Sequence, residues 1–146
     1  MSDLRFEQVD AEATLQDWRH VHNTIIPTAV LSLDEVRERV RRNRLEVAYL
    51  DDALVGCSTV RPPTGEASVA TVIARVLPAH RRQGIGAQLY ARGLEQARKL
   101  GADVIETVVL ATNPDGLRFA HAHGFVEVDR YVLPGDSVPF IDLRLA

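Results

Sequence analysis

The sequence predicts an α/β domain built from seven strands and four helices around one core. Strand-like and helix-like hydrophobic patterns follow one another in the order β-α-α-β-β-β-α-β-α-β-β. The chain has 146 residues, of which 46% are hydrophobic, so it can bury a sizeable core as a single domain over residues 1–146. A glycine-rich loop also joins a nearly uncharged strand to an amphipathic helix, which is typical of a ligand-binding turn.

Residues 1–43 predict one strand and two helices. A short strand over residues 4–9 precedes a helix from about residue 11 to residue 23, and Pro27 then stops the chain. Ser32 and Glu35 have the spacing of a capping box, so a second helix begins there and runs to about residue 42, with its four arginines facing outward. The inward-facing residues of the two helices are Leu15, Trp18, Val21, His22, Val36 and Val40.

A hairpin and a long strand come next. Residues 45–50 and 54–60 are predicted strands around Asp51-Asp52, a turn signal between two apolar runs. Residues 61–65, with the sequence Arg-Pro-Pro-Thr-Gly, are predicted to form a loop. Residues 67–76 then form a nearly uncharged strand, as expected in the middle of a sheet.

The second half predicts two helices and three strands. A helix opens after Gly84 and ends at Gly101, the natural stop for its last turn. Its apolar stripe consists of Ile85, Leu89, Gly93, Ala97 and Leu100. The remaining elements are strands over residues 104–110, 125–132 and 140–145 and a short helix over residues 115–123.

Composition excludes several classes of protein. A net charge of −3 argues against nucleic acid as a partner, because proteins that bind its phosphate backbone usually carry a basic excess. No apolar run approaches the length of a membrane span, and the first residues, Met-Ser-Asp-Leu-Arg, do not resemble a signal peptide. Cys57 is the only cysteine, so we expect no disulfide and a place in the reducing cytoplasm. Histidines two residues apart on a helix, such as His121 and His123, point in opposite directions, so we expect no metal site.

The run Arg-Arg-Gln-Gly-Ile-Gly over residues 81–86 has the chemistry of a pyrophosphate site. Two glycines let the backbone approach a ligand closely, and the following helix directs its unpaired N–H groups at the loop. A plain helix start beside a basic pair is the alternative interpretation. A dinucleotide-binding fingerprint would need a glycine at Leu89, and a P-loop would need a lysine, whereas the only lysine is Lys99.

Two motifs resemble the signatures of the GNAT superfamily, the acyl-CoA-dependent N-acyltransferases. The first, Q/R-x-x-G-x-G/A, is matched by Arg81, Gly84 and Gly86. The second is matched by Asn113, Phe119 and the Gly124-Phe125 pair, and the order of elements over residues 4–145 is that of the family. The resemblance implies a mixed, mostly antiparallel central sheet of about seven strands with about four helices, splayed between strands four and five.

The same resemblance implies how acetyl-CoA is held as cosubstrate. Its pyrophosphate lies on the backbone of the loop Arg81, Arg82, Gln83, Gly84, Ile85, Gly86 and Ala87. Its pantetheine arm pairs with the end of the fourth strand around Ala74 and Val76, where a bulge is expected to open the sheet. The backbone amide near Val76 serves as oxyanion donor, Asn113 bonds the pantetheine amide and Phe119 lines the groove.

The usual catalytic side chains of the family are missing here. The places of its general bases hold Ala70, Val72, Ala74 and Val108, and its acid, a tyrosine, is replaced by Ala120. Glu106, on the same strand face as Val108, is a candidate base acting through a water, although an arginine partner is the more usual role of such a residue. His123 is a candidate acid, although packing in the core is the preferred interpretation.

The resemblance implies an N-acetyltransferase that moves an acetyl group from acetyl-CoA to a primary amine of a small molecule or a protein. The competing interpretation is a catalytically weak or inactive acyl-CoA-binding module, and an O- or S-directed acyltransferase is a third. The partners are acetyl-CoA and an amine acceptor, with no nucleic acid or membrane, and a homodimer stays open. The acceptor pocket is expected at residues 25–32 and 133–140. Its anionic edge would come from Asp34, Glu35, Glu46 and Asp136.

Overall fold

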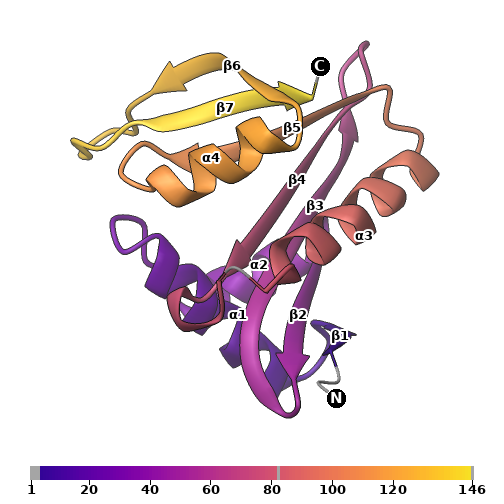
Figure 1. The fold of residues 1–146 in the computed structure, drawn as a ribbon, viewed down its shortest axis with the longest axis vertical. Helices are drawn as coiled ribbons and strands as arrows, with labels where there is room; N and C mark the ends of the chain where they lie inside the picture. Colours follow the sequence, from indigo (N-terminus) through magenta and orange to yellow (C-terminus); the bar gives the residue numbers. More distant parts are fainter. Residues whose placement is uncertain (1–3, 82, 146) are drawn as a thin grey trace.

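The protein folds around one twisted sheet, here described from a computed structural model that covers residues 4–81 and 83–145 (Figure 1). In these residues the sheet has seven strands in the order β1-β2-β3-β4-β5-β7-β6. The strands are β1 (Leu4–Gln8), β2 (Arg44–Leu50), β3 (Ala53–Thr64), β4 (Val69–Val76), β5 (Val104–Leu110), β6 (Phe125–Tyr131) and β7 (Phe140–Leu145). The helices are α1 (Glu12–Ile25), α2 (Leu33–Arg42), α3 (Ile85–Lys99) and α4 (Pro114–Ala122), with a 3-10 turn at Pro78–His80.

The sheet divides into two halves between β4 and β5, as the resemblance implied. Strands β1 to β4 form an antiparallel half, and β5, β7 and β6 form a second antiparallel half. The only parallel pair in the described residues joins them, and its register ends at Thr71 opposite Glu106. Beyond this pair β4 and β5 separate, and Figure 1 shows them diverging toward the glycine loop. The fold class predicted from the sequence is therefore confirmed.

The expected bulge at the end of β4 is absent. Pairing with β3 runs in unbroken register from Arg61 opposite Thr71 to Gly56 opposite Val76. The sheet opens instead because β5 leaves β4 after Glu106, while its pairing with β7 continues from Glu106 to Leu110. The gap is thus produced by lost pairing on one edge of β4 and not by an extra residue within it.

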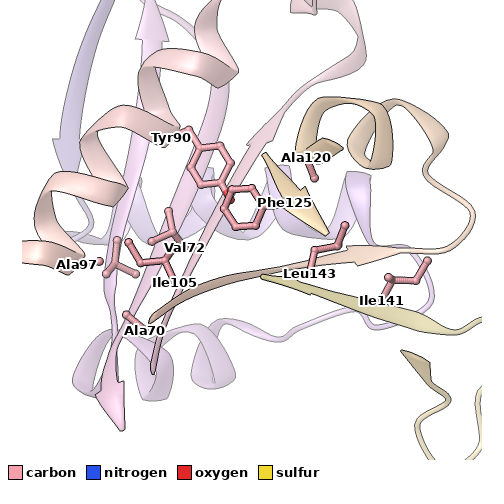
Figure 2. Packing of buried hydrophobic residues seen from close by; sticks show 10 residues of the cluster. Ala70, Val72, Tyr90, Ala97, Ile105, Ala120, Phe125, Ile141 and Leu143 are labelled. Atoms are coloured by element: carbon pink, nitrogen blue, oxygen red, sulfur yellow. The ribbon is translucent and has the colours of Figure 1, made fainter. Parts of the chain in front are cut away.

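Helices cover both faces of the first half of the sheet. On one face, Val60 and Val72 pack with Tyr90 and Ala97 of α3. On the other, Cys57 packs with Trp18 of α1 and Val36 of α2. Neighbouring strand residues of opposite parity point to opposite faces, so the two clusters lie on either side of one layer. Figure 2 shows the first cluster, which continues through Phe125 and Leu143 into the second half of the sheet.

Most predicted elements are confirmed within two residues, and the exceptions have local causes. The Ser32–Glu35 capping box is present, with Ser32 Oγ accepting from Glu35 N at 3.2 Å. Residues 61–64 are strand and not loop, because β2 stops pairing opposite Val60 and leaves Pro62 and Pro63 on a free edge. Leu100 is 54% exposed, since it forms the C-cap of α3 and lies outside its buried stripe.

One arginine of α2 also departs from the prediction that all four face outward. Arg39 is partly buried, and burial together with Arg61 lowers its pKa. Among the described helices, none is long and apolar enough to cross a membrane.

Candidate functional site

A cavity of about 390 Å³ occupies the gap between β4 and β5. It extends from the glycine loop to the end of α1, where Ile25 and Ile26 contribute to its wall. It brings together most of the residues that the resemblance assigned to the cosubstrate, namely Ala74, Val76, Arg81, Gly84, Ile85, Gly86, Ala87, Asn113 and Phe119. Gln83 instead lines a separate small pocket beside Leu4 and Leu50, and Arg82 lies outside the described residues.

Two glycines shape the loop at the mouth of this cavity. Gly84 is the N-cap of α3 with φ of 77°, a left-handed conformation that side chains other than glycine rarely adopt. A Cβ at Gly84 would meet no atom of the described residues within 4 Å, so the space beside it is open to a ligand. A Cβ at Gly86 would lie 3.2 Å from Phe119 Cε2, so glycine here allows α3 to approach α4 closely.

The mouth carries a positive electrostatic field. The first turn of α3 contains no acidic residue, and its unpaired N–H groups and helix dipole favour an anion. Arg81 donates to the Val76 carbonyl oxygen at 3.2 Å and pairs with Asp115 at 3.1 Å. Asp115 also pairs with Arg118, which together with Arg81 lowers the pKa of its carboxyl group. Two arginines thus face one carboxylate, which leaves positive charge available to a phosphate.

Asn113 has a structural role that precedes any contact with a ligand. Its side-chain oxygen accepts a hydrogen bond from Gly116 N at 3.1 Å and so caps the N-terminus of α4. Only the NH₂ of its amide is then left to donate into the cavity.

The inner wall contains a tyrosine, Tyr90, that was not among the predicted site residues. Tyr90, from α3, stacks on Phe119 and Phe125 with ring centroids 5.6 and 5.1 Å away, and Figure 2 shows its ring beside that of Phe125. Ala120 lines the same cavity. The hydroxyl of Tyr90 is buried near Thr107 of β5, but no partner among the described residues meets it with normal hydrogen-bond geometry. Burial raises the pKa of Tyr90, so the group stays protonated at neutral pH. Its position directly after Leu89, at the edge of the apolar stripe, was the available signal.

The two candidate proton-transfer residues lie away from the cavity wall. Glu106 Oε2 accepts from Arg144 Nε at 2.9 Å and from Nη2 at 2.6 Å, across the β5–β7 pair. His123 follows the last residue of α4 and is exposed, so packing in the core, the interpretation preferred above, is wrong. Its Nδ1 lies 2.8 Å from the Phe119 carbonyl oxygen, and its ring leans on that of Phe119 with centroids 4.1 Å apart.

The expected anionic edge of the acceptor pocket is not present as predicted. Glu46 points to the α3 side of the sheet, where Arg92 binds both of its carboxylate oxygens at 3.1 Å. Asp34 pairs with Arg37, and Glu35 completes the cap of α2. Residues 25 and 26 do line the cavity, whereas no residue of 133–140 does.

Among known proteins, the chain matches one family model but no single curated sequence. A model of the acetyltransferase (GNAT) family matches residues 11–125, which is more than half of the chain. No curated protein sequence matches it significantly.

Solved structures with the same fold have low sequence identity. One is the structure of yncA from Salmonella typhimurium with its cofactor acetyl-CoA. The match covers 97% of this chain and 92% of yncA, with a TM-score of 0.72 and 18% sequence identity. For Arabidopsis thaliana NAA60 in complex with a bisubstrate analogue, the coverage is 97% of each chain, the TM-score 0.76 and the identity 15%. For the ribosomal-protein-S18-alanine N-acetyltransferase of Escherichia coli, the coverage is 98% and 93%, the TM-score 0.75 and the identity 16%.

Proposed function

The chain belongs to the GNAT family of acetyltransferases, and from that premise we propose that it transfers an acetyl group from acetyl-CoA to a primary amine by direct attack. The observation that carries the proposal is the continuous cavity between β4 and β5, which joins the glycine loop to the end of α1. A cosubstrate entering at the loop and an amine entering near α1 would meet inside the sheet. A structural relative that holds acetyl-CoA and another that holds a bisubstrate analogue support this arrangement.

The residues at the cavity fit each part of the cosubstrate. The loop around Gly84, with Arg81 and Arg118, suits a pyrophosphate. In the part of the chain that the structure describes, the edge of β4 beyond Thr71 has no strand partner on its β5 side, so its backbone can pair with the amides of an extended pantetheine arm. When bound, acetyl-CoA supplies a thioester that a neutral amine can attack.

The chain's own contribution to chemistry is positioning and hydrogen bonding. We assign the backbone amide near Val76 as donor to the developing oxyanion, a type of contact worth about 10²–10³-fold in rate. A thiol with a pKa of about 8.5 leaves tolerably well without an acid, so the replacement by Ala120 does not prevent turnover. Tyr90 stacks on Phe119 at the same cavity wall and so fixes the ring that lines the groove, while its own hydroxyl is buried.

The function is tested by incubating the protein with acetyl-CoA and a broad panel of primary amines. We expect free thiol to appear only when an amine is present, with the acetylated amine detected by mass spectrometry. The competing function, an acyl-CoA-binding module, predicts saturable CoA binding with no thiol release from any amine. That second outcome would overturn the enzyme assignment while leaving the cosubstrate site intact.

Glu106, acting through a water, stays our proposed proton acceptor, and His123 stays a candidate acid. The relay predicts that Glu106→Gln lowers kcat/KM at neutral pH. The loss should shrink in alkaline buffer, because the amine then loses its proton to solvent. The matched control is Arg144→Gln, which breaks the same ion pair but keeps the carboxylate. If both variants show the wild-type pH profile, Glu106 serves only to pair with Arg144.

A further inference from the structure

Arg75 is a cavity-lining arginine that has no counterion among the described residues. It belongs to β4, and its side chain is partly buried against the wall that also contains Val76 and Ile26. Within residues 4–81 and 83–145 its guanidinium makes no ion pair or side-chain hydrogen bond, whereas Arg81, which lines the same cavity, has a carboxylate partner. Arginine in the interior normally has an anionic partner, so this absence needs a reason.

Two further arginines add positive charge near Arg75, and the other titratable groups beside it are neutral. Burial lowers the pKa of Arg75 most, and Arg61 of β3 and Arg39 of α2 lower it further. The residue opposite Arg75 in the β3 register is Cys57. Burial raises the pKa of the Cys57 thiol to about 12, so the thiol is neutral. Burial, with Arg75 as the next cause, lowers the pKa of His22 to about 4. His22 is therefore neutral as well and adds no repulsion.

The carboxylates nearby act on the other two arginines. Asp142 of β7 interacts with Arg61, and Glu35 interacts with Arg39. The charges acting on Arg75 include no carboxylate among the described residues. The unmatched positive charge of this face is thus concentrated on the one arginine of the three that lines the cavity.

The place of Arg75 gives the missing anion a source. The residue alternates with Ala74 and Val76, which face α3, so it lies on the α1 side of the sheet, beside the segment where the acceptor is expected. The pantetheine arm is uncharged, and the phosphates of CoA are assigned to the loop that begins α3, the helix that packs on the other face of the sheet from Arg75. Only the acceptor can then bring an anion to Arg75.

We propose that Arg75 binds the carboxylate of the acceptor, and that the acceptor is a small amino acid. This inference rests on the proposed acetyl transfer. A guanidinium matches a carboxylate with two parallel hydrogen bonds, which orients the attached amine as well as binding it. The acceptor must share about 390 Å³ with the end of the pantetheine arm, so it is small. A polyamine would be repelled by the same charge.

Binding of reaction products tests the site without any turnover. Several N-acetyl amino acids are each compared by calorimetry, in the presence of CoA, with the corresponding carboxamide, which has nearly the same shape but no charge. We expect the wild-type protein to bind the carboxylates at least tenfold more tightly and Arg75→Gln to bind both forms equally. Arg41→Gln, an exposed arginine of α2, is the matched control and should keep the preference. A preference that is missing in the wild type, or that survives in Arg75→Gln, would overturn the proposal.

Kinetics and stability separate this proposal from the function on which it rests. Arg75→Gln should raise KM for an amino acid at least tenfold and leave KM for acetyl-CoA unchanged. Because the substitution removes an unpaired charge, we expect an equal or higher melting temperature, and a clearly lower one would point to a structural role for Arg75 and overturn the proposal. If no amine is acetylated but the product preference holds, acetyl transfer fails as the function while the carboxylate site stands.

Discussion

Gly84→Val should weaken CoA binding by more than tenfold without unfolding the protein. The side chain would enter open space, so no internal clash is expected, but that space is where a phosphate approaches the backbone of the loop. A branched residue at φ of 77° also costs about 1–2 kcal/mol in the folded state. Isothermal titration with CoA, together with a thermal melt of each variant, measures the two effects separately.

Gly65→Val is the matched control for this experiment. Gly65 has φ of 76° and, like Gly84, has nothing within 4 Å of an added Cβ, but it lies in the turn between β3 and β4 outside the cavity. Both variants should therefore lose similar stability, and only Gly84→Val should lose affinity. Wild-type CoA affinity in Gly84→Val, or an equal loss in both variants, would remove the loop as the pyrophosphate site.

The features that could be predicted from the sequence are those decided by neighbouring residues. The capping box at Ser32 and Glu35 and the glycine at position 84 are decided by a few neighbouring residues, and both are present in the structure. The order of elements is also recoverable, because each strand or helix has its own hydrophobic period. The splay between β4 and β5 followed from the resemblance and not from any period within the chain.

What the sequence did not predict depends on pairing between distant segments. Pro62 and Pro63 are compatible with a strand only because β2 has already ended beside them. His123 was expected in the core because it occupies a place that the family usually fills with a buried leucine, whereas in the structure it caps the end of α4 and is exposed. Arg75 looked like an ordinary strand residue, since a missing counterion is visible only when the neighbouring elements are placed.

Glu46 is the clearest case of a charge whose role needs the tertiary structure. It was expected at the acceptor pocket, yet its side chain is 2% exposed and faces α3. Arg92 holds both of its oxygens, Arg44 donates to Oε2 at 3.0 Å, and Gln96 donates to the same oxygen at 3.2 Å. Arg92 in turn lies over the Phe6 ring, 4.4 Å from its centroid. One carboxylate therefore ties β2 to α3 and, through Arg92, to β1.

We expect Glu46→Ala to lower the free energy of unfolding by about 3 kcal/mol. Removing one partner of a buried ion pair typically costs about 3–5 kcal/mol, because the remaining charge is left without compensation. Here Arg92 and Arg44 are each 41% exposed and can turn to solvent, which places the loss at the lower end. Urea denaturation measures it. Glu12→Ala, which removes an exposed carboxylate that pairs with Arg37, is the control and should lose much less.

The stabilisation by Glu46 should also depend on pH in a defined direction. Burial opposes its ionisation, but the hydrogen bonds from Arg92 and Arg44 outweigh burial and lower the pKa of Glu46. A carboxyl whose pKa is lowered on folding stabilises the folded state above its unfolded pKa of about 4.3, and this stabilisation is lost as pH falls through the folded value. The stability difference between wild type and Glu46→Gln should therefore be full at pH 7 and shrink in acid. A difference that is constant from pH 7 to pH 3 would mean that the shape of the side chain, and not its charge, stabilises this junction of β2 and α3.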